Sequence, residues 1–127
     1  MKRDMDLVRH ILIATEKAEG PLDIEEISKD GVRYSLPLVA YHVEMLDAHG
    51  LLDASLTKSW GDEVVGGTIK ALTWDGCDYL DAIRDAGVWA KTKEVVKEAV
   101  GSTTLEVIKQ AAVMVATSVI KAHLGIT

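Results

Sequence analysis

The sequence predicts a mainly α-helical fold with a small β-hairpin, namely a winged helix-turn-helix followed by a C-terminal helical extension. Three observations lead to this fold class. Segments of helical periodicity precede Gly50, two strand-like segments follow it, and the rest of the chain is helical again. We expect residues 1–90 to form the winged helix-turn-helix domain and residues 91–127 to form the extension.

The first two helices are each predicted from an apolar stripe and a residue that can cap the start. In the first, apolar residues recur every three to four positions, and Asp4 or Asp6 can act as the N-cap. Asp23 can cap the second. The predicted ranges are 4–18 and 23–29.

The third helix, predicted over 37–49, is the one that winged-helix proteins usually lay in the DNA major groove. Pro37 is typical of a first helical turn, and Gly50 is typical of the position after a helix end. Its inward face and the neighbouring core are predicted to contain Val39, Val43, Leu46, Leu51, Leu72 and Leu80.

A β-hairpin, the wing, is predicted after the third helix. Its strands are expected over about 51–56 and 68–74, and the polar segment 58–67, with three glycines, is expected to be a loop. Thr73 or Asp75 can then cap a fourth helix. The remaining helices are predicted over 75–86, 88–100 and 104–124, with a break at Gly87.

Charge is unevenly distributed along the chain, whose net charge is −6. Residues 1–90 hold nine Lys and Arg against seventeen Asp and Glu, whereas residues 91–127 hold five Lys against three Glu. Phosphate contacts supply most non-specific affinity for nucleic acid. An acidic main domain is therefore unfavourable for a nucleic-acid binder.

Several function classes find no support in the sequence. The single cysteine, Cys77, rules out an intramolecular disulfide and a multi-cysteine metal site, and it suits the reducing cytoplasm. No secretory signal is visible, and the most apolar stretch, Ala111 to Ile120, is too short to span a bilayer. We find no nucleophile with a base, no phosphate loop and no metal motif, so we expect a cytoplasmic protein with no enzymatic activity, no catalytic residue, no cofactor and no membrane partner.

Two segments carry a resemblance to bacterial winged-helix repressors of the ArsR type. The first is Tyr41-His42-Val43-Glu44-Met45-Leu46 followed by Asp47-Ala48-His49-Gly50-Leu51-Leu52, which resembles the end of the recognition helix in those repressors. The second is Leu72-Thr73-Trp74-Asp75-Gly76, which resembles their Leu-Thr-x-x-Gly entry into the helix after the wing.

A more specific resemblance covers nearly the whole chain. The opening Met-Lys-Arg-Asp-Met-Asp-Leu, the Tyr41-His42 helix, Leu72-Thr73-Trp74, and Leu80-Asp81-Ala82-Ile83-Arg84-Asp85 with the following Trp89 resemble the DUF2513 family. That resemblance implies a winged-helix fold in a bacterial, often prophage or phage, setting. It implies no established activity.

Eight residues are candidates for contacting double-stranded DNA, because cations neutralise phosphates and polar side chains reach base edges. His42 either contacts DNA or fixes the third helix against the first. The cations either form a stripe beside the third helix or are scattered surface charges. The candidates are Lys2, Arg3, Arg33, Ser35, Tyr41, His42, Lys58 and Lys70.

Three other residues are candidates for contacting a partner protein. Glu44 and Asp47 should make the exposed face of the third helix acidic, and carboxylates repel phosphates. Trp60, at the wing tip, either enters a groove or a partner protein or folds back on the hairpin. Trp74 and Trp89, by contrast, are expected in the core.

The last helix carries an apolar stripe that must be buried somewhere. It either pairs with a second copy in a homodimer, which is our prediction, or packs on its own chain. The residues of this predicted dimer interface are Leu105, Ile108, Ala112, Val115 and Val119.

Two functions are compatible with these patterns. The first is a dimeric, DNA-binding transcriptional regulator of phage or prophage type. The second is an acidic protein-binding module that uses the same scaffold to modulate or inhibit a host protein. The position of the cations relative to the third helix should distinguish them.

Overall fold

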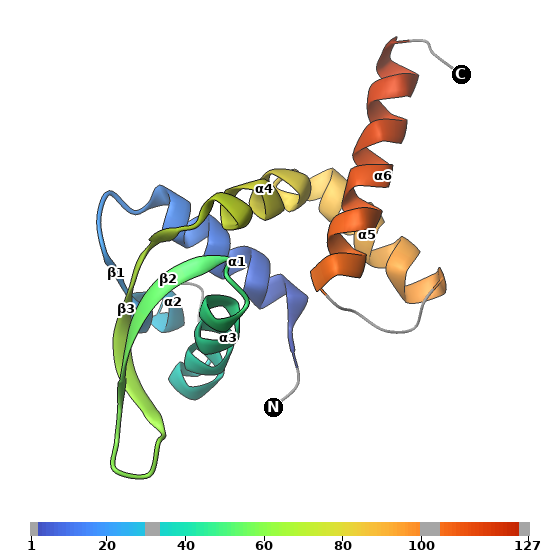
Figure 1. Cartoon of the computed structure of the whole chain (residues 1–127). Helices are drawn as coiled ribbons and strands as arrows, with labels where there is room; N and C mark the ends of the chain where they lie inside the picture. The colour runs from blue at the N-terminus through green and yellow to red at the C-terminus, as the bar shows by residue number, and fades with distance from the viewer. Residues whose placement is uncertain (1–2, 30–33, 100–104, 125–127) are drawn as a thin grey trace. The chain divides into compact units, whose positions relative to one another are not determined.

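The computed structural model describes residues 3–29, 34–99 and 105–124 (Figure 1). The chain divides into two compact units, residues 1–78 and 79–127. The division into domains at residues 90 and 91, expected from the sequence, stays a prediction.

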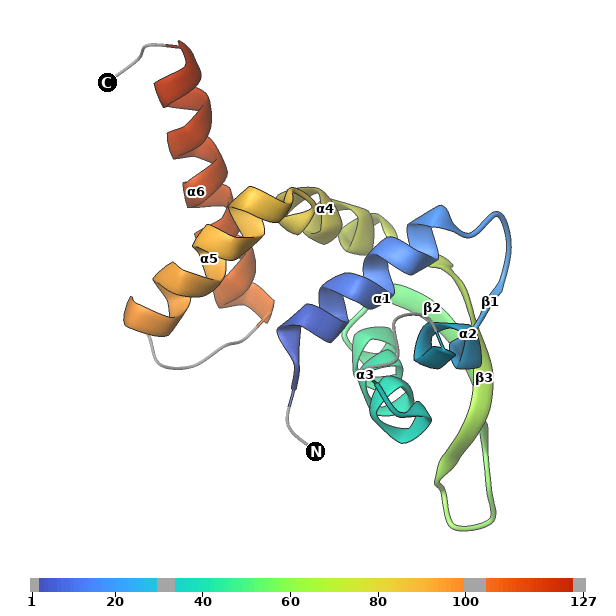
Figure 2. The same cartoon turned by 180° about the vertical axis from the view of Figure 1, so that it is seen from behind.

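The first unit has a winged helix-turn-helix fold. Three helices, α1 (Met5–Lys17), α2 (Ile24–Lys29) and α3 (Leu36–Ala48), precede a hairpin of β2 (Leu52–Lys58) and β3 (Val64–Leu72). All three helices contact β3 and lie beside the hairpin in both views (Figures 1 and 2). The core of this unit consists of buried aliphatic side chains from these helices and the sheet. The fold class predicted from the sequence is confirmed.

Asp4 sets the start of α1. Its carboxylate accepts hydrogen bonds from the backbone N–H groups of Asp6 and Leu7, at 3.0 and 3.2 Å. Asp4, not Asp6, is therefore the N-cap. Leu7, Ile11 and Leu12 are completely buried, so the predicted apolar face of this helix packs into the core.

The end of α3 forms a Schellman motif, as the glycine after it predicts. The Leu51 N–H donates to the Leu46 carbonyl, and the Gly50 N–H donates to the Asp47 carbonyl. Val39, Val43, Leu46 and Leu51 are buried as predicted, whereas Leu72 is only half-buried.

The sheet has three antiparallel strands in the order β1-β3-β2. The strand β1 (Leu22–Asp23), which the sequence analysis missed, pairs Leu22 with Ile69. The loop expected over 58–67 is wrong, because only residues 59–63 lie between the wing strands. Gly67 lies within β3 opposite Leu56, where a side chain would collide with the backbone of β2.

Thr73 joins the wing to α4 (Trp74–Ile83). Its hydroxyl donates to the Gly50 carbonyl and accepts from the Gly76 N–H at 3.0 Å, so it caps the helix as predicted. Its own N–H donates to the Leu51 carbonyl at 3.2 Å. The start of α4 is thereby held against the end of α3.

Trp74 is not a core residue, contrary to the sequence-based prediction, because 83% of it is exposed. Gly76 is buried and faces the Leu51 carbonyl. Since residues two apart on a helix lie about 200° apart around its axis, Trp74 faces away from that contact. Trp89, in contrast, is buried as predicted.

The second unit contains the end of α4 with α5 (Ala86–Ala99) and α6 (Leu105–Leu124), and α5 packs against α6. The predicted break at Gly87 is wrong, because Asp85 accepts the Val88 N–H at 2.9 Å and starts α5 before the glycine. The buried side chains of α5 and α6 are Trp89, Thr92, Val96, Ile108 and Ala112.

Tyr79 carries a buried polar group in this unit. It is 2% exposed, and its hydroxyl has no hydrogen-bond partner within the described ranges. Burial, and then the nearby Glu106 carboxylate, raise the pKa of this hydroxyl well above its usual range.

Candidate binding surface

The side of α3 that lies beside the wing is only partly polar. Ser35 is exposed, and its hydroxyl accepts the Leu38 N–H at 3.4 Å, so it serves as the helix cap. Pro37 and Glu44 are exposed, and Tyr41 is half-buried. This side of α3 therefore offers no array of the long cationic or amide side chains that read DNA bases.

His42 is a core residue, and its candidacy as a DNA contact is withdrawn. Its side chain is completely buried. Its Nε2 accepts the Asp4 N–H and its Nδ1 lies 2.8 Å from the Leu38 carbonyl oxygen, to which it donates. The Tyr41 ring meets the His42 ring edge-on. Of the two interpretations, the one that fixes α3 against the start of α1 is correct.

The wing tip is a tight turn with two acidic residues. The Asp62 N–H donates to the Ser59 carbonyl at 3.0 Å, and the Ser59 N–H donates to the Glu63 carbonyl at 2.8 Å. Asp62 has a φ of 61°, the left-handed conformation that Asp tolerates better than most residues. Trp60 is fully exposed, so it does not fold back on the hairpin.

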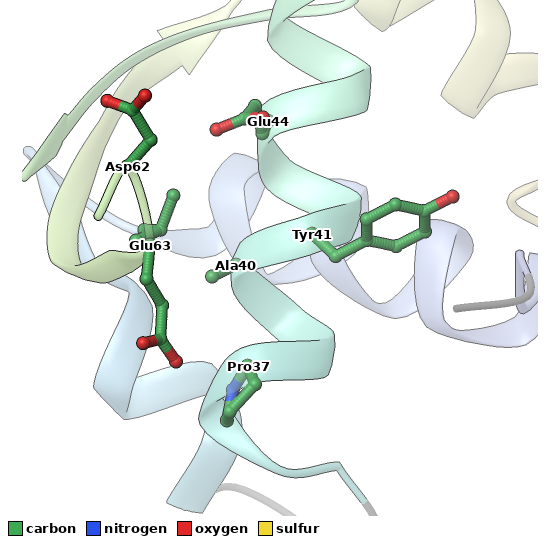
Figure 3. A pocket seen from close by; sticks show the side chains of 7 residues that line it. Pro37, Ala40, Tyr41, Glu44, Asp62 and Glu63 are labelled. Atoms are coloured by element: carbon green, nitrogen blue, oxygen red, sulfur yellow. The ribbon is translucent and has the colours of Figure 1, made fainter. Parts of the chain in front are cut away.

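A groove of about 230 Å³ lies between α3 and the wing tip (Figure 3). We call it the α3–wing groove. Figure 3 shows Ala40 and Glu44 directed from α3 toward the wing, and the Tyr41 ring directed away from it. The residues that line the groove are Pro37, Ala40, Tyr41, Glu44, Asp62, Glu63 and Val64.

The α3–wing groove is acidic. Glu44, Asp62 and Glu63 line it, and the Lys58 Nζ lies 3.4 Å from a Glu44 carboxylate oxygen. Both partners of this ion pair are about half-exposed, so it contributes little stability, but it partly neutralises Glu44. Asp47, just beyond the groove, accepts the Ala54 N–H at 3.1 Å and ties α3 to β2.

Two of the described candidate cations, Lys58 and Lys70, lie on opposite faces of the sheet. Lys58 and the half-buried Leu56 lie on the same face of β2, the one toward α3, and Lys58 forms an ion pair with Glu44. Lys70 follows the buried Ile69 at a bulge and is exposed on the other face of the sheet. Arg3 is exposed before α1. The predictions for Lys2 and Arg33 lie outside the described residues.

The sequence analysis missed most of the groove. Asp62, Glu63 and Val64 lay in what was expected to be a long loop, and Pro37 was considered only as part of a helix start. The adjacent acidic pair at the hairpin tip was the available signal, and the shorter loop brings it to α3.

The predicted dimer residues divide into three groups. Ile108 and Ala112 are completely buried within the chain itself, so they are not free to form an interface. Leu105 and Val115 are half-buried, and the side chain of Val119 lies outside the described residues. A different apolar set of α6 is exposed, namely Val113, Met114 and Ile120.

Within the described ranges, no group of three or more His, Cys, Asp or Glu residues could hold a metal ion. Among the helices of those same ranges, none is long and apolar enough to cross a membrane.

Comparison with known proteins agrees with the family resemblance. The family model described as "Hypothetical protein (DUF2513)" matches residues 2–103. An "Uncharacterized protein" of Haemophilus influenzae is 34% identical over 116 residues, which cover 88% of this chain and 92% of that protein. The reduced form of the transcriptional regulator YodB from B. subtilis matches over 80% of this chain and 86% of its own, with 17% identity and a TM-score of 0.42, a likeness that supports no conclusion about function. The chain belongs to the DUF2513 family.

Proposed function

We propose that this chain is a non-catalytic winged-helix protein that binds a basic partner protein through α3 and the wing. The acidic α3–wing groove carries the proposal. A phosphate at this position would face Glu44, Asp62 and Glu63, and in the described part of the chain only Lys58 there offsets them. The same charges would attract a basic protein surface and speed its association.

A second candidate is a regulator that binds double-stranded DNA. The winged helix-turn-helix fold and the accessible Ser35 and Tyr41 on α3 favour it. In that case Arg3, Lys58 and Lys70 must supply the phosphate contacts, although Lys58 and Lys70 lie on opposite faces of the sheet. We therefore rank DNA second, reversing the order that the sequence alone suggested.

Crosslinking from the wing tip tests the proposal. A photoreactive phenylalanine analogue replaces Trp60, which is fully exposed, and the protein is irradiated in bacterial cells that carry its gene. The matched control carries the analogue at Glu19, an exposed residue after α1. We expect a discrete protein adduct from position 60, absent from position 19, and lost when Glu63→Lys is added.

DNA is tested in parallel by selection from a random duplex pool and from the DNA flanking the gene, at low salt. We expect no enrichment. Reproducible enrichment that Lys70→Glu weakens for all sequences alike, with no protein adduct at position 60, would overturn the proposal in favour of the regulator.

We also propose that the protein forms a homodimer through the exposed side of α6. Val113, Met114 and Ile120 leave large apolar surfaces in water, and an isologous contact with a second copy would cover them. Such a protein would act in the cytoplasm, where the exposed Cys77 would stay reduced.

A further inference from the structure

We infer that the α3–wing groove receives the guanidinium group of one arginine of the partner protein. This inference rests on the proposed function and specifies its ligand. The argument has three parts: the size of the groove, its apolar lining and the arrangement of its carboxylates.

The size suits a single long side chain. A volume of about 230 Å³ is below the roughly 300–1,000 Å³ of pockets that bind drug-sized molecules. The groove lies between a helix and a hairpin tip (Figure 3). It is partly open to solvent, so a side chain on another protein can enter it without a conformational change.

The lining suits a side chain with an apolar stem and a charged end. The exposed Pro37 from α3 and the half-buried Val64 from the wing supply carbon surface, above the buried Ala40. Arginine and lysine bury their methylene stems against such surface while the charged group stays at the polar rim.

The carboxylates suit a guanidinium more than an ammonium. Glu44 projects from α3, and the Asp62 carboxylate lies on the wing at the same end of the groove, whereas the Glu63 carboxylate is directed toward Pro37 (Figure 3). Acceptors therefore lie on both walls, with Glu44 and Asp62 at one end. Among the described residues, Asp62 and Glu63 form no ion pair. A guanidinium has five N–H donors in a planar fork and can bond to acceptors on two sides, whereas an ammonium is a compact point charge.

Lys58 makes the inference distinguishable from DNA binding. Its ammonium nitrogen lies 3.4 Å from a Glu44 carboxylate oxygen, so it competes with an incoming cation for that carboxylate. Lys58→Gln should therefore strengthen arginine binding about two- to fivefold, given the half-exposed position of the pair. DNA binding requires the opposite change, because the substitution removes a phosphate contact.

The test is a titration of the full-length protein with the peptide acetyl-Gly-Arg-Gly-amide, followed by amide chemical shifts in NMR. Peptides with citrulline, which has the same shape without the charge, and with lysine serve as comparisons. We expect saturable shifts at Ala40, Glu63 and Val64, with a Kd on the order of 1 mM for so small a ligand. The lysine peptide should bind about threefold more weakly, and the citrulline peptide should not saturate.

Two double variants with equal charge change complete the test. Asp62→Asn with Glu63→Gln should weaken arginine binding at least about tenfold, and Asn suits the left-handed backbone at position 62. Glu25→Gln with Glu26→Gln removes two exposed carboxylates on α2 and should leave binding unchanged. Equal loss in both variants would reduce the effect to net charge and overturn the inference.

Three other results would also overturn it: equal shifts with citrulline, lysine binding as tight as arginine, or shifts outside the groove. The Trp60 crosslink separates this failure from failure of the proposed function. If the protein adduct survives Asp62→Asn with Glu63→Gln, the surface binds a protein but the arginine assignment is wrong. If no protein adduct forms at all, the proposed function itself fails.

Discussion

Replacement of Gly76 by alanine should destabilise the first unit because there is no space for a side chain. A Cβ atom at position 76 would lie 1.8 Å from the Leu51 carbonyl oxygen, far inside van der Waals contact. The start of α4 would have to move away from Leu51. That movement would break the two hydrogen bonds that join Thr73 to the end of α3, those to the Gly50 and Leu51 carbonyls.

The magnitude follows from these contacts. Two hydrogen bonds at about 1 kcal/mol each give a loss of about 2 kcal/mol, to which the steric clash adds, and the higher helix propensity of alanine returns up to about 1 kcal/mol. We expect the free energy of unfolding to fall by about 1–2 kcal/mol and the Tm to fall by roughly 3–8 °C.

Urea and thermal unfolding followed by circular dichroism measure this change. Gly61→Ala is the matched control, because a Cβ there would meet nothing within 4 Å, and it should change stability by less than about 0.5 kcal/mol. If Gly76→Ala is as stable as the wild type, α4 does not depend on its close approach to Leu51, which would refute this reasoning.

Three further substitutions test other parts of the molecule. His42→Leu removes the acceptor for the Asp4 N–H and should lower the free energy of unfolding in urea by about 2–3 kcal/mol. His42→Gln, which keeps polar atoms, should lie closer to the wild type. If His42→Leu is as stable as the wild type, His42 does not hold α3 against α1. Tyr79→Phe removes a buried hydroxyl that has no hydrogen-bond partner among the described residues and should leave stability at neutral pH unchanged or about 1 kcal/mol higher. The pKa of Tyr79 is raised in the folded state, so above about pH 10 the hydroxyl ionises more readily in the unfolded chain than in the folded one. The free energy of unfolding is therefore unaffected by this group below about pH 10 and falls above it, by up to about 1.4 kcal/mol per pH unit. Tyr79→Phe should therefore lose less stability than the wild type between about pH 10 and 12. Met114→Glu should give monomers in sedimentation at tens of micromolar, whereas the same change at an exposed apolar residue of the wing, Val65→Glu, should not; a monomeric wild type would refute the dimer.

The sequence predicted the helices of the fold well because their signals are local. Asp4, the glycine after α3 and Thr73 each act on groups within a few residues, and each does so in the structure. The wing was harder to predict, because two of the three glycines that indicated a loop lie within β3, where Gly67 is required by the close approach of β2. The two-residue strand β1 has no periodicity, so only its tertiary pairing reveals it.

The candidate site was only partly predictable, because it depends on which segments meet in space. Glu44 was correctly identified as exposed and acidic, but its pairing with Lys58 depends on the strand register. Nothing in the local sequence of His42 distinguishes a buried helix-fixing side chain from a DNA contact. The hydrogen bond from the Asp4 N–H to the His42 ring joins residues 38 positions apart, so no local sequence pattern predicts it.

The two proposed interfaces depend on each other energetically. One arginine in the α3–wing groove gives binding on the order of 1 mM, too weak for a specific complex by itself. A dimer presents two grooves, and a partner with two suitably spaced arginines would bind the second with an effective concentration near the millimolar range, which can raise the overall affinity by 10²–10⁴.

Met114→Glu should therefore weaken binding of a two-arginine partner at least about a hundredfold while leaving the titration with acetyl-Gly-Arg-Gly-amide unchanged. Isothermal titration with peptides that carry two arginines on linkers of graded length measures this difference. Affinity that is independent of linker length, or equal in Met114→Glu and the wild type, would mean that each groove acts alone and that self-association of α6 serves another purpose.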